Sequence, residues 1–133
     1  MKTRFDWTTG PLAEGLHCYR TQQFFAAHEH WEGVWLSLRE PEKSFLQALI
    51  QITAAFHHLQ SDNPRGAISL LGRALRRLEC SAPECCCLNA ALLRNQARDW
   101  LSALQNEGSQ LPAAYPAFQL LDTGGSSQNL TEP

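Results

Sequence analysis

The spacing of hydrophobic residues along the chain predicts helices throughout. Apolar positions recur three and four residues apart, which is the period of a helix with one buried face. No stretch shows the strict alternation expected of a half-buried strand. The predicted helices cover residues 12–19, 22–38, 42–60, 64–79 and 89–105. The pattern therefore predicts an all-α fold: a single compact domain of about five helices, packed as an irregular bundle.

The helical period stops after residue 105. Residues 111–121 include Tyr115 and Phe118 and are apolar enough to lie extended over the helices. Residues 122–133 are polar and rich in Gly and Ser, a composition typical of a mobile terminus. We therefore expect a helical domain over residues 1–121 and a polar C-terminal tail over residues 122–133.

The helix over residues 42–60 is apolar on most of its faces, which is typical of a central, buried helix. Its apolar positions are Phe45, Leu46, Leu49, Ile50, Ile52, Ala54, Phe56 and Leu59. The exceptions are Gln47 and Gln51, one turn apart, with His57 and His58 further along the same side. Buried glutamines need hydrogen-bond partners. The pattern therefore predicts a polar site beside this helix.

The preceding helix offers such partners. It places His28, Glu29 and Glu32 among Phe25, Trp31 and Trp35, and His28 and Glu32 stand one turn apart. Helices joined by a short connection pack as antiparallel neighbours. We therefore expect Gln47 and Gln51 to be buried and hydrogen-bonded to the His28, Glu29 and Glu32 group. The predicted inward cluster consists of His28, Glu29, Glu32, Gln47, Gln51 and His57.

Three interpretations of this cluster follow from the residue types. His28 and Glu32 have the spacing of two zinc ligands in H-E-x-x-H enzymes, with Glu29 in the place of the general base, although Glu32 replaces the second histidine. The metal-ligand candidates are then His28, Glu32 and His57. Alternatively, the cluster is a structural hydrogen-bond network that fixes the packing of two helices. The third interpretation is a pocket for a small polar or cationic ligand, walled by aromatic residues.

Charge and composition narrow the class of protein. The chain has 133 residues and a formal net charge of −2, so bulk charge gives no reason to expect a nucleic-acid partner. Arg73, Arg76 and Arg77 lie near the end of one helix, where a solvated face is favoured over an anion-binding patch. No apolar run approaches the ~20 residues of a membrane span, and the first residues lack the apolar core of a secretory signal. A cytoplasmic protein is expected, and a homo-oligomer is compatible with the pattern.

The cysteines are Cys18, Cys80, Cys85, Cys86 and Cys87. An odd count with three adjacent residues is a poor disulfide framework and agrees with a reducing compartment. Adjacent side chains rarely converge on one tetrahedral zinc ion, so a structural loop over residues 80–88 is favoured over a zinc site. No Ser or Cys has a base at motif spacing, and no catalytic residue is assigned.

Three segments together resemble a known family. They read Phe24-Phe25-x-Ala27-His28-Glu29-x-x-Glu32-x-x-Trp35, Phe45-Leu46-Gln47-x-Leu49-Ile50-Gln51 and Asn63-x-x-Gly66-Ala67. This pattern is similar to that of the prokaryotic family known only as domain of unknown function 309. The resemblance spans roughly residues 15–104 and implies a small all-helical domain. It also implies that His57 rather than His58 points inwards, and that Asn89 caps a helix.

The chain departs from the family pattern in two places. Arg20-Thr21-Gln22 occupies a turn that usually reads Asn-x-Gly, and Ala26 replaces a common glutamate. The family brings no established activity and no cofactor. The sequence therefore predicts a small helical protein that binds a small ligand or metal ion at its His/Glu/Gln cluster. The alternative is a non-catalytic interaction or scaffold module in which that cluster is a structural hydrogen-bond network.

Overall fold

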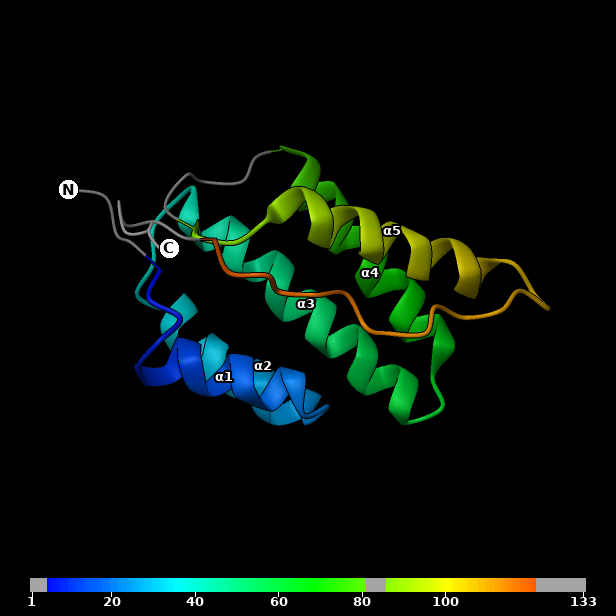
Figure 1. The fold of residues 1–133 in the computed structure, drawn as a ribbon, viewed down its shortest axis with the longest axis horizontal. Coiled ribbons are helices and arrows are strands. Elements are labelled where there is room, and N and C mark those ends of the chain that lie inside the picture. Colours follow the sequence, from blue (N-terminus) through cyan, green and yellow to red (C-terminus); the bar gives the residue numbers. More distant parts are fainter. Residues whose placement is uncertain (1–4, 81–85, 122–133) are drawn as a thin grey trace, which may run out of the picture.

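A computed structural model describes residues 5–80 and 86–121, and within these ranges the chain forms five helices (Figure 1). They are α1 (Gly10–Arg20), α2 (Phe24–Trp35), α3 (Glu42–Gln60), α4 (Pro64–Cys80) and α5 (Ala90–Gln105). The described residues contain no strand beyond one isolated bridge between Leu88 and Leu120. The predicted all-α fold is confirmed. The predicted polar tail, residues 122–133, and Cys85 lie outside the described residues.

The helix ends follow from local chemistry. The Asn63 side chain accepts a hydrogen bond from the Gly66 amide at 3.1 Å, and the Asn89 side chain accepts one from the Leu92 amide at 3.1 Å. An Asn at this position satisfies one of the otherwise unpaired amides of the first turn. Asn63 and Asn89 are thus N-caps, as the sequence predicts.

Helix α2 is shorter than the predicted 22–38. Gln22 has a positive φ of 65°, which keeps it out of the helix, so α2 begins only at Phe24. At the other end the Ser37 hydroxyl donates to the carbonyl of Val34, and the backbone turns away after Trp35. Both changes leave the motif residues on α2 in place.

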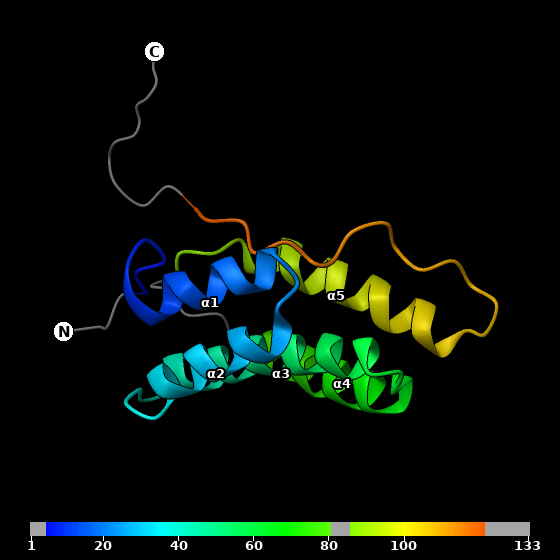
Figure 2. The ribbon, with the colours of Figure 1, turned by 90° about the horizontal axis from the view of Figure 1, so that it is seen from below.

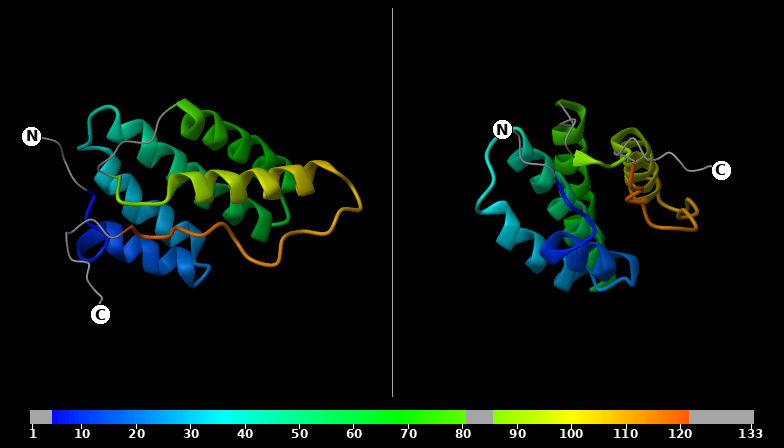
Figure 3. Two further views of the ribbon diagram at one scale, coloured as in Figure 1. Left: turned by 45° about the horizontal axis from the view of Figure 1, so that its top comes forward. Right: turned by 60° about the vertical axis from the view of Figure 1, so that its left-hand side comes forward.

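Consecutive helices pack on one another, and Figure 2 shows the result as two layers. Helices α2, α3 and α4 form one layer, while α1 and α5 lie in the other. The extended segment that follows α5 runs back over α3, between α1 and α5 (Figures 1 and 3). The prediction that residues 111–121 lie extended over the helices is confirmed. No helix in the described part of the chain is long and apolar enough to cross a membrane.

The extended segment completes an aromatic core. The Phe118 ring stacks on Tyr19 at a centroid distance of 4.3 Å and on Trp31 at 5.4 Å. Tyr115 stacks on Trp100 at 5.3 Å and meets Phe56 edge-on at 4.8 Å. Aromatic pairs at these distances add stability beyond the area that they bury. The segment is therefore part of the hydrophobic core.

Helix α3 has two opposite faces. Phe45, Leu49, Ile52 and Phe56 are almost fully buried and face the aromatic core. Gln47, Gln51, Ala54 and His58 follow one another at helical spacing on the other side. We call these the inner and the outer face of α3. Of the polar residues that the sequence singles out on this helix, Gln47, Gln51 and His58 lie on the outer face.

Candidate functional site

The structure distributes the residues of the predicted cluster over several places. His28 and His57 line one pocket between α2 and α3, whereas Gln47 lines a different pocket. Glu29 and Glu32 are exposed, and Gln51 is buried. Two of the three metal-ligand candidates, His28 and His57, are thus brought together, and the six residues do not form one cluster.

The pocket between α2 and α3 has a volume of about 270 Å³. It is lined by Phe25, His28, Ala54, His57 and His58, and we call it the histidine pocket. The Phe25 ring lies between two imidazoles, with centroids 5.3 Å from His28 and 5.2 Å from His57. Phe25 remains half exposed. The lining of the pocket thus consists of four rings and the small side chain of Ala54.

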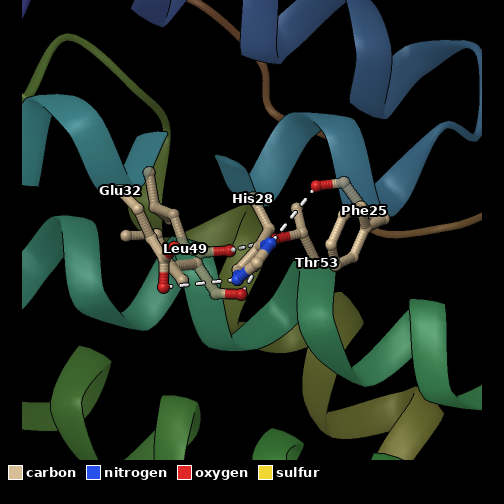
Figure 4. A network of polar contacts seen from close by, with 6 residues as sticks. Phe25, His28, Glu32, Leu49 and Thr53 are labelled. Carbon is tan, nitrogen blue, oxygen red and sulfur yellow. Dashed lines mark hydrogen bonds and ion pairs between the residues drawn. The ribbon is translucent and has the colours of Figure 1, made fainter. Parts of the chain in front are cut away.

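His28 is held in place by its own helix. Its Nε2 lies 3.3 Å from Glu32 Oε2, and its Nδ1 lies 3.2 Å from the carbonyl oxygen of Phe25. Figure 4 shows the ring pointing from α2 towards α3, between Glu32 and Phe25. Both ring nitrogens have a partner, so the imidazole has one preferred orientation. The Glu32 side chain is 56% exposed, and an exposed i,i+4 pair of this kind contributes little to stability.

His58 and His57 keep free hydrogen-bonding atoms. Asn63 accepts the Gly66 amide through Oδ1, so its Nδ2 is the group that donates to His58 Nδ1 at 3.1 Å. This places the proton of the neutral His58 ring on Nε2, which has no partner in the described part of the chain. His57 makes only ring contacts there, with Phe25 and His58. These imidazole nitrogens thus lack partners among the described residues, while the surface of the pocket itself is almost entirely apolar.

The expected hydrogen bonds from Gln47 and Gln51 to His28, Glu29 or Glu32 do not occur in the described structure. Gln51 is 7% exposed, and its Oε1 is buried without a hydrogen-bond partner among the described residues.

The rotation of α2 explains why the expected hydrogen bonds are missing. One residue corresponds to about 100° around a helix, so Glu29 is turned away from His28, on the far side from the buried Phe24, Ala27 and Trp31. The hydroxyl of Thr53, on α3 opposite His28, donates to the carbonyl of Ile50 on its own helix at 2.8 Å (Figure 4). A continuous network between the two helices is therefore not formed by the described residues.

The described residues contain no group of three or more His, Cys, Asp or Glu side chains that could hold a metal ion. The geometry therefore gives no support to a metal site on His28, Glu32 and His57. His57 and His58 are both half buried and both line the histidine pocket, so the geometry does not single out His57 as the inward residue.

The cysteine segment shows mixed surroundings where it is described. Cys80 is exposed, while Cys86 and Cys87 are buried. Burial raises the pKa of the Cys86 thiol, and its Sγ donates to the carbonyl of Leu88 at 3.6 Å. A buried thiol with a raised pKa is a poor nucleophile. The backbone carbonyl of Cys86 also accepts a hydrogen bond from the indole of Trp7 at 2.8 Å, so this residue fastens the N-terminal segment.

A second pocket on the outer face of α3 was not anticipated. It has a volume of about 260 Å³ and is lined by Trp35, Glu40, Lys43, Ser44, Gln47 and Arg77. The sequence signal that could have found it is the i,i+4 spacing of Lys43 and Gln47 beside the end of α2. The contribution of Arg77 depends on how α3 and α4 are aligned, which the sequence pattern does not specify.

Comparison with known proteins identifies the family but no activity. No curated protein and no solved structure matches the chain. One family model matches, over residues 12–70, a span that contains α1 except its first residues, all of α2 and α3, and the start of α4. The histidine pocket lies entirely within this span. Residues 12–70 of this chain therefore belong to the family described as Domain of unknown function (DUF309).

Proposed function

We propose that this chain is a small-molecule-binding domain whose ligand occupies the histidine pocket. The observation that carries the proposal is the convergence of three half-buried imidazoles and the exposed ring of Phe25 on one pocket between two helices. Ligand sites are mostly apolar cavities with a few convergent polar groups, often between helices of a bundle. A volume of about 270 Å³ lies at the small end of such sites, which favours a ligand of one or two rings.

The chemistry of the lining favours a planar ligand with an acceptor group. The Phe25 and His57 rings offer faces for stacking, and His58 offers an Nε2–H donor once Asn63 has engaged its Nδ1. Glu29 and Glu32 do not line the pocket, so the acidic groups expected to recognise a cationic ligand are not available there. An aromatic carboxylate combines a flat ring with an acceptor and fits these features.

Binding of 1-naphthoate, followed by isothermal titration calorimetry, tests the proposal. We expect saturable one-to-one binding that weakens about tenfold in His57→Ala, because this variant removes one ring and one imidazole from the wall. His17→Ala is the matched control, since His17 is exposed on α1 and does not line the pocket. Cyclohexane carboxylate tests the aromatic requirement and should bind more weakly than naphthoate. The absence of binding, or equal weakening by both variants, would overturn the proposal.

The interaction-module alternative has its own distinguishing observation. Leu36 is 73% exposed just after α2. If the chain is an interaction module, Leu36→Glu will change its apparent mass in analytical ultracentrifugation while naphthoate fails to bind. If naphthoate binds and the mass is unaffected, the ligand-binding proposal is supported.

A further inference from the structure

A cluster of hydrogen-bond donors gathers at the second pocket on the outer face of α3. Four segments meet there: the end of α2, the connection that holds Glu40, the first turns of α3 and the C-terminal half of α4. Gln47 on α3 and Arg77 on α4 line the same pocket, as expected if the two helices are antiparallel. At the other end of the same pair, a Cβ on Gly66 would lie 3.1 Å from the His58 ring. The packing of two long helices therefore holds Arg77 beside the first turns of α3.

The charges in this pocket are unbalanced. Lys43 and Arg77 face a single carboxylate, that of Glu40. Glu40 is already engaged, because its Oε1 accepts the Ser44 backbone amide at 3.0 Å and so satisfies the start of α3. Lys43 Nζ lies 4.2 Å from the centroid of the Trp35 ring, a cation–π contact, and neither cation has an ion pair among the described residues. The pocket has an excess of positive charge.

Several side chains of the pocket are donors without acceptors in the described part of the chain. The Ser44 hydroxyl, the Gln47 amide and the Arg77 guanidinium make no hydrogen bond within the described residues. The indole nitrogen of Trp35 is buried and has no acceptor there. Leaving a buried N–H unpaired costs about 1–3 kcal/mol, so such a group marks a place where an acceptor is missing. The other indoles differ: those of Trp7, Trp31 and Trp100 each donate to a backbone carbonyl, at 2.8, 3.2 and 2.9 Å.

We propose that this pocket, which we call the cationic pocket, binds the phosphate group of a small phosphorylated molecule. A planar guanidinium and an ammonium held by two different helices suit an anion whose oxygens point in several directions. A phosphate accepts from Lys43, Arg77 and Ser44 at once, and the positive end of the α3 dipole adds to the attraction. The volume exceeds what inorganic phosphate needs, which leaves room for an organic group. This site is separate from the histidine pocket.

The tryptophan indole signals in a ¹H–¹⁵N spectrum provide the test. Inorganic phosphate and phenyl phosphate are titrated at constant ionic strength, with acetate as the carboxylate control. We expect the Trp35 indole signal to move saturably, because its ring touches Lys43, while the signals of Trp7, Trp31 and Trp100 stay in place. Phenyl phosphate should bind more tightly than inorganic phosphate if the organic group is accommodated. Equal affinities would assign the site to free phosphate.

A pair of neighbouring arginines gives a matched control. Arg77→Gln should weaken phosphate binding about tenfold, since a charge-assisted hydrogen bond is lost. Arg76→Gln should change it less than about twofold, because Arg76 does not line the pocket. The proposal is overturned if the Trp35 signal does not move, if acetate binds as tightly as phosphate, or if the two arginine variants weaken binding equally.

Discussion

Buried polar groups near the inner face of α3 have hydrogen-bond partners, whereas, among the described residues, two of those near the outer face do not. Over the inner face, the hydroxyl of Tyr19 donates to the carbonyl of Pro116 at 2.7 Å, and the indole of Trp100 donates to that of Ala114 at 2.9 Å. At the outer face, Gln51 Oε1 and Trp35 Nε1 are buried with no partner in the described part of the chain. Satisfied groups stabilise a fold, whereas unsatisfied ones lower stability and occur at functional sites. The inner face therefore serves stability, and the outer face is where we propose that binding occurs.

The largest difference between the two faces should appear when an aromatic ring is removed from each. Phe118→Ala should lower the free energy of unfolding by about 3–5 kcal/mol, because the ring is fully packed between Tyr19 and Trp31. Phe25→Ala on the outer side should cost less than about 1 kcal/mol, because Phe25 is 50% exposed. Urea unfolding measures both. Similar losses in the two variants would break the comparison.

Tyr19→Phe tests a hydrogen bond of the inner face and also gives a pH dependence. Desolvation raises the pKa of the buried Tyr19 phenol well above its usual range, and Tyr115 adds to this effect. The folded state thus holds the phenolic proton more tightly than the unfolded state, whose pKa is about 10. The resulting stability is fully present below that pH and is lost as the pH rises above it.

The Tyr19→Phe variant should be less stable by about 1–3 kcal/mol at pH 7, because the Pro116 carbonyl is left without its donor. Above about pH 10 its stability should fall less steeply than that of the parent. Urea unfolding at pH 7 and at several values above pH 10 measures both effects. Parallel curves for the two proteins would show that Tyr19 is not the group responsible.

On the outer face, replacing a buried polar residue by an apolar one should raise the stability of the protein. Gln51→Met keeps the shape of the side chain but removes a buried acceptor that lacks a partner, so stability should rise by about 1 kcal/mol. Thermal unfolding of the two proteins measures this. A clear loss of stability would mean that Gln51 is engaged in the protein in solution.

The smallest effect is expected for Glu32→Gln. Its contact with His28 is an exposed i,i+4 pair, so neutralising it should change stability by less than about 0.5 kcal/mol. A loss of 3 kcal/mol or more, measured in urea, would instead indicate the buried structural network that the sequence allows.

The sequence predicts the local features of this chain well. Helix α3 begins and ends at the predicted residues, and Asn63 and Asn89 cap helices as expected. These features depend on hydrophobic period and capping chemistry within a few residues of each other.

The sequence predicts the site only in part, because the site depends on how helices are rotated and aligned. The sequence places Glu29 next to His28. It does not specify which face of α2 packs on the core, and in the structure Glu29 is exposed to solvent. The sequence also does not predict that Arg77 lies near Lys43, because this depends on how α3 and α4 are aligned. His28 and His57 do share a pocket, because Phe25 and Ala54 leave space between two neighbouring helices.

The most direct test of the outer face as the binding face uses the histidine ring signals in a ¹H–¹³C spectrum during titration with 1-naphthoate. Of the five histidines, His28, His57 and His58 line the histidine pocket, while His17 and His30 lie outside it. We predict that the three pocket signals move saturably with one common dissociation constant and that the other two stay in place. If all five signals move together, or if only His17 and His30 respond, the outer face of α3 is not the binding face.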